Sequence, residues 1–87
     1  MKKIVITGAL GYIGMELCKI YSGKSLNYDV LAIDIKFYSA RVNQLNSWNI
    51  KFKQLDILDL KAINQDLENA DIVFHLAGIT DVPTIKS

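Results

Sequence analysis

Residues 3–14 read Lys3-Ile4-Val5-Ile6-Thr7-Gly8-Ala9-Leu10-Gly11-Tyr12-Ile13-Gly14. The first part is a continuous run of mostly β-branched, apolar residues, which is typical of a strand buried on both faces. A glycine-rich part follows at once, and an apolar pattern with helical spacing begins within it. Such a junction gathers unpaired backbone N–H groups and the positive end of the helix dipole at one point. The stretch therefore predicts an anion-binding turn between a strand and a helix.

Each glycine of this turn has an expected role. Gly8 allows the sharp turn, Gly11 lets a pyrophosphate approach the backbone, and Gly14 lets the helix pack closely on the strand. Glycines spaced by three also occur by chance in loops, so the pattern alone is weak. Asp34 strengthens it, because this residue ends a second apolar run and lies 20 residues after Gly14. That spacing is typical of the acid that binds the adenosine ribose of a dinucleotide.

Asp34 also predicts the cofactor. Its carboxylate would accept hydrogen bonds from the ribose hydroxyls and repel a 2′-phosphate, so NAD is favoured over NADP. Lys36 and Arg41 lie close enough in the sequence to soften that repulsion.

Short β-branched runs alternate with longer amphipathic segments along the rest of the chain. Residues 29–34 and 71–76 predict two more strands buried on both faces, and residues 50–53 alternate as in an edge or half-exposed strand. Between the first two strands, a helix that stops near Gly23 is predicted. The apolar residues that predict its buried face are Ile13, Leu17, Ile20 and Tyr21.

Two further helices complete the alternation. One begins at Asp59, which is available as an N-cap. Its apolar residues recur at helical spacing: Leu60, Ile63 and Leu67. Residues 37–48 predict a short or irregular helix at best, with Val42 and Leu45 on its apolar face. The order β-α-β-α-β-α-β predicts an α/β fold, a doubly wound parallel sheet of the Rossmann type, because parallel strands need right-handed crossovers.

Length and composition exclude several classes of protein. With 87 residues, 51% hydrophobic and 22% charged, the chain is one folded domain at most. The net charge of +1 is spread along the chain, so we expect no nucleic-acid partner. The apolar runs are too short for a membrane span or a signal peptide. Cys18 is the single cysteine and forms no internal disulfide, which favours a cytoplasmic protein and predicts no metal site.

Several landmarks resemble one family. Thr-Gly-x-x-Gly-x-x-Gly at residues 7–14 resembles the extended short-chain dehydrogenase/reductase family, which includes nucleotide-sugar epimerases and dehydratases. Leu55-Asp56-Ile57, with Asp59 two residues later, is similar to the acidic stretch after that family's third strand. Residues 70–78 are similar to its fourth strand and His-x-Ala-Ala ending, with Gly78 in place of the second alanine. The resemblance covers nearly the whole chain and implies four strands of a larger dinucleotide-binding fold.

The resemblance also implies a role for particular residues toward bound NAD. The pyrophosphate would be held by Gly8, Gly11, Tyr12, Ile13 and Gly14, with Tyr12 and Ile13 acting through their backbone N–H groups. Asp34 would bind the adenosine ribose. The adenine would lie against Asp56 and Ile57, and the middle of the cofactor against Leu76, Ala77 and Gly78.

The catalytic pattern of the family is missing from these residues. Family members use a Tyr-x-x-x-Lys pair, in which the tyrosine is the acid and base at the substrate hydroxyl and the lysine lowers its pKa. The residues four positions after the tyrosines of this chain are Glu16, Ser25, Ala32 and Val42. We therefore expect residues 1–87 to be the N-terminal part of a dinucleotide-binding domain, with the substrate domain elsewhere and no catalytic residue here.

Three hypotheses follow for the function. The first is the NAD-binding part of a nucleotide-sugar epimerase or dehydratase that uses transient hydride transfer, with a possible homodimer formed by regions outside these residues. The second is a non-catalytic nucleotide-binding or redox-sensing module on the same half-fold. The third is a gene remnant, whose exposed sheet edge would tend to aggregate.

Three other residues are expected to have structural roles. His75 ends a strand inside the resemblance to the family's cofactor-lining ending, so hydrogen bonding and packing are favoured over catalysis. Cys18 is expected to be a buried, inert thiol on the first helix. Trp48 is expected to pack or to cap before the third strand.

Overall fold

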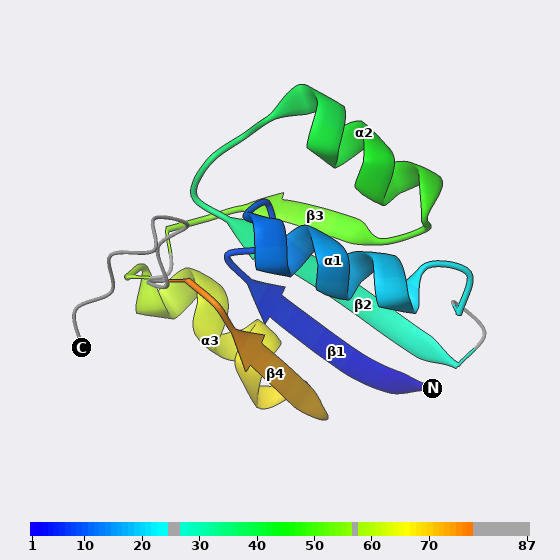
Figure 1. The fold of residues 1–87 in the computed structure, drawn as a ribbon. Helices are drawn as coiled ribbons and strands as arrows, with labels where there is room; N and C mark the ends of the chain where they lie inside the picture. Colours follow the sequence, from blue (N-terminus) through cyan, green and yellow to red (C-terminus); the bar gives the residue numbers. More distant parts are fainter. Residues whose placement is uncertain (25–26, 57, 78–87) are drawn as a thin grey trace, which may run out of the picture.

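The computed structural model describes residues 1–24, 27–56 and 58–77. Strands and helices alternate throughout, as the sequence predicts (Figure 1). In chain order they are β1 (Lys2–Thr7), α1 (Tyr12–Tyr21), β2 (Tyr28–Asp34), α2 (Ser39–Ser47), β3 (Lys51–Gln54), α3 (Leu60–Glu68) and β4 (Ile72–His75). Among the described residues, no helix is long and apolar enough to cross a membrane.

The four strands form one sheet in the order β3-β2-β1-β4, and every neighbouring pair is parallel. Ile4 of β1 lies opposite Val30 of β2 on one side and Ile72 of β4 on the other. Because all strands run the same way, their carboxyl ends meet at one edge of the sheet (Figure 1). The α/β fold class and the parallel sheet are therefore confirmed.

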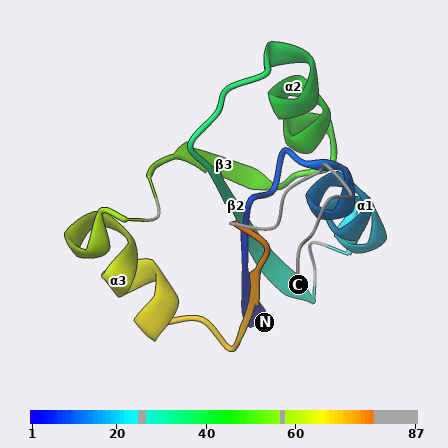
Figure 2. The ribbon, with the colours of Figure 1, turned by 60° about the vertical axis from the view of Figure 1, so that its left-hand side comes forward.

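Helices cover both faces of the sheet, with α1 and α2 on one face and α3 on the other (Figure 2). Alternate residues of β1 supply the two cores, because successive side chains of a strand point to opposite faces. Ile4 and Ile6 pack in the cluster under α1 and α2, and Val5 packs with Ile63 of α3. The doubly wound arrangement follows from a first strand whose consecutive residues Ile4, Val5 and Ile6 are all apolar and buried.

The predicted face of helix α1 is buried only in part, because Leu17 and Tyr21 pack against the core as expected and the other two predicted residues do not. Gly14 and Cys18 are its buried residues, whereas Ile13 and Ile20 are 57% and 60% exposed. Gly14 has no side chain, so the backbone of the helix can lie close to the end of β1 at this residue. Burial raises the pKa of the Cys18 thiol to about 12, in keeping with the inert role expected for it.

Two other expectations need correction. Residues 39–47 form a helix, α2, that is short, as expected, and regular, because Val42 and Leu45 anchor its apolar face in the core. Strand β4 is not buried on both faces. Ile72 and Val73 are each 39% exposed, since β4 is the edge strand of the described sheet.

The expected ends of the helices are largely confirmed. Asp59 caps α3, because its side chain accepts a hydrogen bond from the Ala62 N–H at 3.3 Å. Trp48 is the C-cap residue of α2 and packs against the core. Gly23 follows the end of α1 with a φ of 78°, a value that favours glycine.

Helix α3 depends on one buried side chain for its contact with the sheet. Ile63 is 1% exposed and packs with Val5, Leu31 and Ile33. We expect Ile63→Ala to lower the free energy of unfolding by about 3 kcal/mol, through lost burial and a residual cavity. Ile20→Ala, the same change at an exposed position of α1, should alter it by less than about 0.5 kcal/mol. Urea denaturation followed by circular dichroism measures both, and equal effects would contradict this assignment of the core.

Candidate functional site

A cleft of about 690 Å³ lies at the carboxyl ends of the strands, within the roughly 300–1,000 Å³ typical of small-molecule sites. The turn after β1 forms its floor, and the segments that follow β2, β3 and β4 contribute to its walls. The site residues predicted from the sequence meet there: Gly8, Gly11, Tyr12, Ile13, Gly14, Asp34, Asp56, Leu76 and Ala77. Ile57 and Gly78 were predicted with them and lie outside the described residues.

The glycine-rich turn presents free backbone donors to this cleft. Gly11 is the N-cap of α1 and supplies no side-chain hydrogen bond. The first helical bond runs from the Met15 N–H to the Gly11 carbonyl at 2.9 Å. The N–H groups of Tyr12, Ile13 and Gly14 therefore have no protein partner in the described part of the chain. Together with the helix dipole, these three donors suit an anion such as a pyrophosphate.

Close backbone packing shapes this turn. A Cβ added at Gly14 would lie 2.5 Å from the Gly8 carbonyl oxygen, and one added at Gly8 would lie 2.8 Å from the Ala77 nitrogen. Gly8 also has a φ of 69°, which disfavours a side chain. The turn is held to the next strand by a hydrogen bond of 3.1 Å from the Ala9 N–H to the Ile33 carbonyl. Helix α1 thus begins in close backbone contact with the turn after β1.

Asp34 lies at the end of β2 with both carboxylate oxygens engaged by the backbone. Its Oδ2 accepts a hydrogen bond from the Leu10 N–H at 2.9 Å, and its Oδ1 accepts one from the Lys36 N–H at 3.0 Å. These bonds hold the carboxylate against the glycine-rich turn. Each oxygen keeps lone-pair capacity for a further donor, such as a ribose hydroxyl.

The end of β4 is fixed to β1 through Thr7, which sequence reasoning missed. Thr7 is fully buried, and its Oγ1 accepts a hydrogen bond from the Ala77 N–H at 3.2 Å. The same hydroxyl lies 3.3 Å from His75 Nδ1. His75 therefore has the hydrogen-bonding role expected for it. The bond from the Ala77 N–H to Thr7 holds Ala77 at the cleft. The position of Thr7 directly before the first glycine was the available signal.

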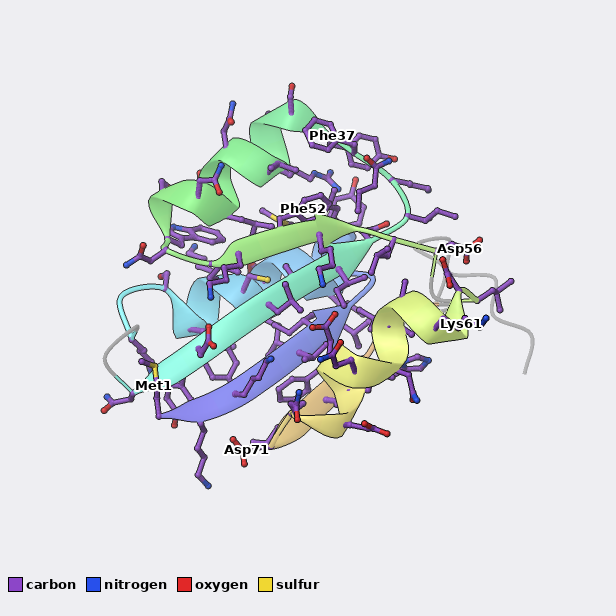
Figure 3. The ribbon with its side chains drawn as sticks, turned by 180° about the vertical axis from the view of Figure 1, so that it is seen from behind. Met1, Phe37, Phe52, Asp56, Lys61 and Asp71 are labelled. Carbon is purple, nitrogen blue, oxygen red and sulfur yellow. The ribbon has the colours of Figure 1, made fainter. Side chains whose placement is uncertain are left out.

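The segment after β3 completes another wall. Leu55 and Asp56 line the cleft, and Asp56 Oδ1 accepts a hydrogen bond from the Leu58 N–H at 2.9 Å. Asp56 is exposed at the end of β3, beside the start of α3 (Figure 3).

Tyr12 and two further lining residues, Tyr38 and Arg41, form a cluster that was not predicted as such. The Arg41 guanidinium lies 5.5 Å from the ring centroid of Tyr12 and 5.2 Å from that of Tyr38. Both distances are typical of cation–π contacts. Arg41 Nη1 also donates a hydrogen bond to the Leu10 carbonyl. The sequence hint was that Arg41, the only arginine of the chain, lies seven residues after Asp34.

Metal chemistry has no support among the described residues. They contain no group of three or more His, Cys, Asp or Glu side chains that could hold a metal ion. The arrangement of the cleft is that of a binding site built from backbone donors, one fixed carboxylate and a guanidinium.

Comparison with known proteins assigns this arrangement to a family. Residues 5–87 match the 3-beta hydroxysteroid dehydrogenase/isomerase family. Among curated relatives, the chain is 34% identical to a dTDP-D-glucose 4,6-dehydratase of Dictyostelium discoideum and 33% identical to a UDP-glucose 4-epimerase of Schizosaccharomyces pombe. The alignments cover 94% and 91% of this chain. They cover only 20% and 24% of those relatives, so the chain spans less than a quarter of their length.

Solved structures agree with the fold. The UDP-glucuronic acid 4-epimerase of Bacillus cereus, in complex with UDP-glucuronic acid and NAD, is 34% identical with a TM-score of 0.64. That match covers 85% of this chain and 26% of the epimerase. The dTDP-glucose 4,6-dehydratase of Bacillus anthracis, in complex with NAD, is 19% identical with a TM-score of 0.70 and shares the fold. It covers 88% of this chain and 27% of that enzyme. The resemblance to extended short-chain dehydrogenases/reductases is thereby confirmed.

The site depends on the absence of a side chain at Gly14. We expect Gly14→Ala to lower the free energy of unfolding by about 3 kcal/mol, because the new methyl group would overlap backbone atoms that cannot move away. Gly23→Ala is the control, since a Cβ there meets nothing within 4 Å and only its positive φ is strained. That change should cost about 1 kcal/mol. Thermal or urea unfolding compares the two, and an equal loss would contradict the close-packing argument.

Proposed function

The chain belongs to the 3-beta hydroxysteroid dehydrogenase/isomerase family, and from this membership we propose that residues 1–87 form the NAD-binding N-terminal part of a larger dinucleotide-binding domain. The observation that carries the proposal is the glycine-rich turn. Its three N–H groups without a protein partner in the described part of the chain belong to residues that line the cleft. Backbone donors at a helix N-terminus are the usual receptor for a dinucleotide pyrophosphate.

The other lining residues suit the remaining parts of NAD. We assign the pyrophosphate to the turn from Gly8 to Gly14, and the adenosine ribose to Asp34. The fixed orientation of the Asp34 carboxylate supports this role, because its free lone pairs can accept from two ribose hydroxyls. Asp56 would lie beside the adenine, and Leu76 and Ala77 beside the middle of the cofactor. The same proposal includes Ile57 and Gly78, which neighbour these residues in the sequence.

For the whole protein we propose a nucleotide-sugar epimerase or dehydratase. Bound NAD would supply the acceptor for a hydride from the sugar, and in these reactions the hydride is later returned. Support comes from relatives whose names include dTDP-D-glucose 4,6-dehydratase and UDP-glucose 4-epimerase. This chain's share of the work is to bind and orient the cofactor. A cytoplasmic location and a homodimer formed outside these residues belong to the same proposal.

A second candidate function is a non-catalytic nucleotide-binding or redox-sensing module. This function needs only the NAD site, whose lining residues are described above. The two candidates share the NAD site and differ in whether a substrate is oxidised.

The ribose role of Asp34 predicts a selective loss of NAD affinity. We expect Asp34→Asn to weaken NAD binding at least about tenfold, because a charge-assisted hydrogen bond contributes about 1.5–3 kcal/mol. Asp71→Asn is the matched control. Asp71 also accepts a backbone N–H, from Lys3 at 2.7 Å, but lies at the opposite end of the sheet (Figure 3). Calorimetric titration of both variants measures the effect, and an equal change in the two would refute the role of Asp34.

Hydride transfer distinguishes the enzyme from the binding module. We expect the full-length protein, loaded with NAD, to develop the near-ultraviolet absorbance of reduced nicotinamide when UDP-glucose or dTDP-glucose is added. The matching control omits the nucleotide sugar. Tight NAD binding without reduction by either sugar, and without conversion of either sugar detected by chromatography, would favour the binding module instead.

A further inference from the structure

Two cations line the cleft beside Asp34. Lys36 follows it by two residues, and Arg41 lies in the first turn of α2. Neither forms an ion pair with a carboxylate among the described residues. Positive charge is therefore available at the place where the adenosine ribose is proposed to bind.

Arg41 is held in place with most of its donors unused. Its Nη1 donates to the Leu10 carbonyl, while the N–H of the same Leu10 donates to Asp34. Asp34 and Arg41 therefore meet at a single residue of the glycine-rich turn. A guanidinium has five N–H donors, and the remaining four of Arg41 have no protein partner in the described part of the chain.

Two tyrosines orient this guanidinium. Tyr12 and Tyr38 contact it from the start of α1 and the N-cap of α2. These contacts restrict the side chain before any ligand arrives, so less conformational entropy is lost on binding. A planar, fixed guanidinium with free donors matches the geometry of a phosphate group.

Asp34 is less repulsive toward a phosphate than an isolated carboxylate. Both of its oxygens accept a backbone N–H, so its negative charge is partly compensated by two amide dipoles. A 2′-hydroxyl can still donate to it. A 2′-phosphate, by contrast, would turn toward the free donors of Arg41 and the ammonium of Lys36.

We propose that the cleft accepts dinucleotides with or without a 2′-phosphate, so that NADP binds as well as NAD, and that Arg41 is the residue that determines this breadth of specificity. Lys36 contributes a second positive charge. The inference rests on the proposed function, because it needs the adenosine ribose to lie beside Asp34.

Calorimetric titration with NAD and with NADP tests this inference. In the full-length protein we expect the two dissociation constants to lie within about tenfold of each other. Arg41→Gln should weaken NADP binding about ten- to a hundredfold and NAD binding less than about threefold, since only the phosphate loses a charge-assisted pair. The NADP affinity of Arg41→Lys should lie between those of the wild type and Arg41→Gln. Lysine keeps the positive charge but cannot form the two parallel hydrogen bonds of a guanidinium. Lys19→Gln removes a positive charge from an exposed position of α1 outside the cleft and should change neither.

Each other outcome has a distinct meaning. NAD binding with NADP more than about tenfold weaker would overturn the inference and leave the proposed function standing. Equal weakening of both cofactors by Arg41→Gln would also overturn it, and would make Arg41 a positioning residue for the turn. Failure of the folded protein to bind either cofactor, with folding checked by circular dichroism, would overturn the proposed function and the inference together.

Discussion

The close approach of α1 to the turn after β1 is the contact on which the rest of the structure depends. At Gly14 the helix backbone lies so near Gly8 and Ala9 that no Cβ fits between them. This approach places the first N–H groups of α1 over the carboxyl end of β1, where an anion can reach them. It also turns Cys18 toward the sheet and leaves Ile13 and Ile20 exposed. One missing side chain thus determines both the anion site and the orientation of the helix.

Strand order determines where this turn opens. The chain passes from β1 to β2 and β3 on one side, and then returns to place β4 on the other side of β1. Connections on the two sides of β1 therefore diverge, which leaves a crevice at the carboxyl ends of β1 and β4. Thr7 spans that crevice at its base through its hydrogen bond with the Ala77 N–H. The crevice is therefore open to a ligand, while the hydrogen bond at its base holds the ends of β1 and β4 together.

Patterns of apolar residues predicted the elements well where burial alone determines them. Residues 4–6 and 30–33 are apolar at every position because both faces of these strands are covered, and the parallel sheet followed from that. Asp34 lies in the cleft as predicted, because it is the last residue of β2 and the cleft lies at the carboxyl ends of the strands. The buried face of α1 was predicted only in part. Leu17 and Tyr21 pack against the core, whereas Ile13 and Ile20 are exposed because Gly14, which contributes no hydrophobic signal, lies against the turn after β1. The regularity of helix α2 was not predicted, because Val42 and Leu45 are its only two buried residues and give a weak apolar pattern.

The Tyr12–Arg41–Tyr38 cluster was beyond such patterns, because it depends on side chains from two separate segments, the start of α1 and the start of α2, meeting in space. Its position has a physical consequence for the site as a whole. Leu10 is bound through its N–H to β2 and through its carbonyl to α2, so the turn cannot shift without breaking one of these bonds. The carboxylate, the guanidinium and the free N–H donors are consequently oriented before a ligand binds. Such preorganisation reduces the entropy lost on binding.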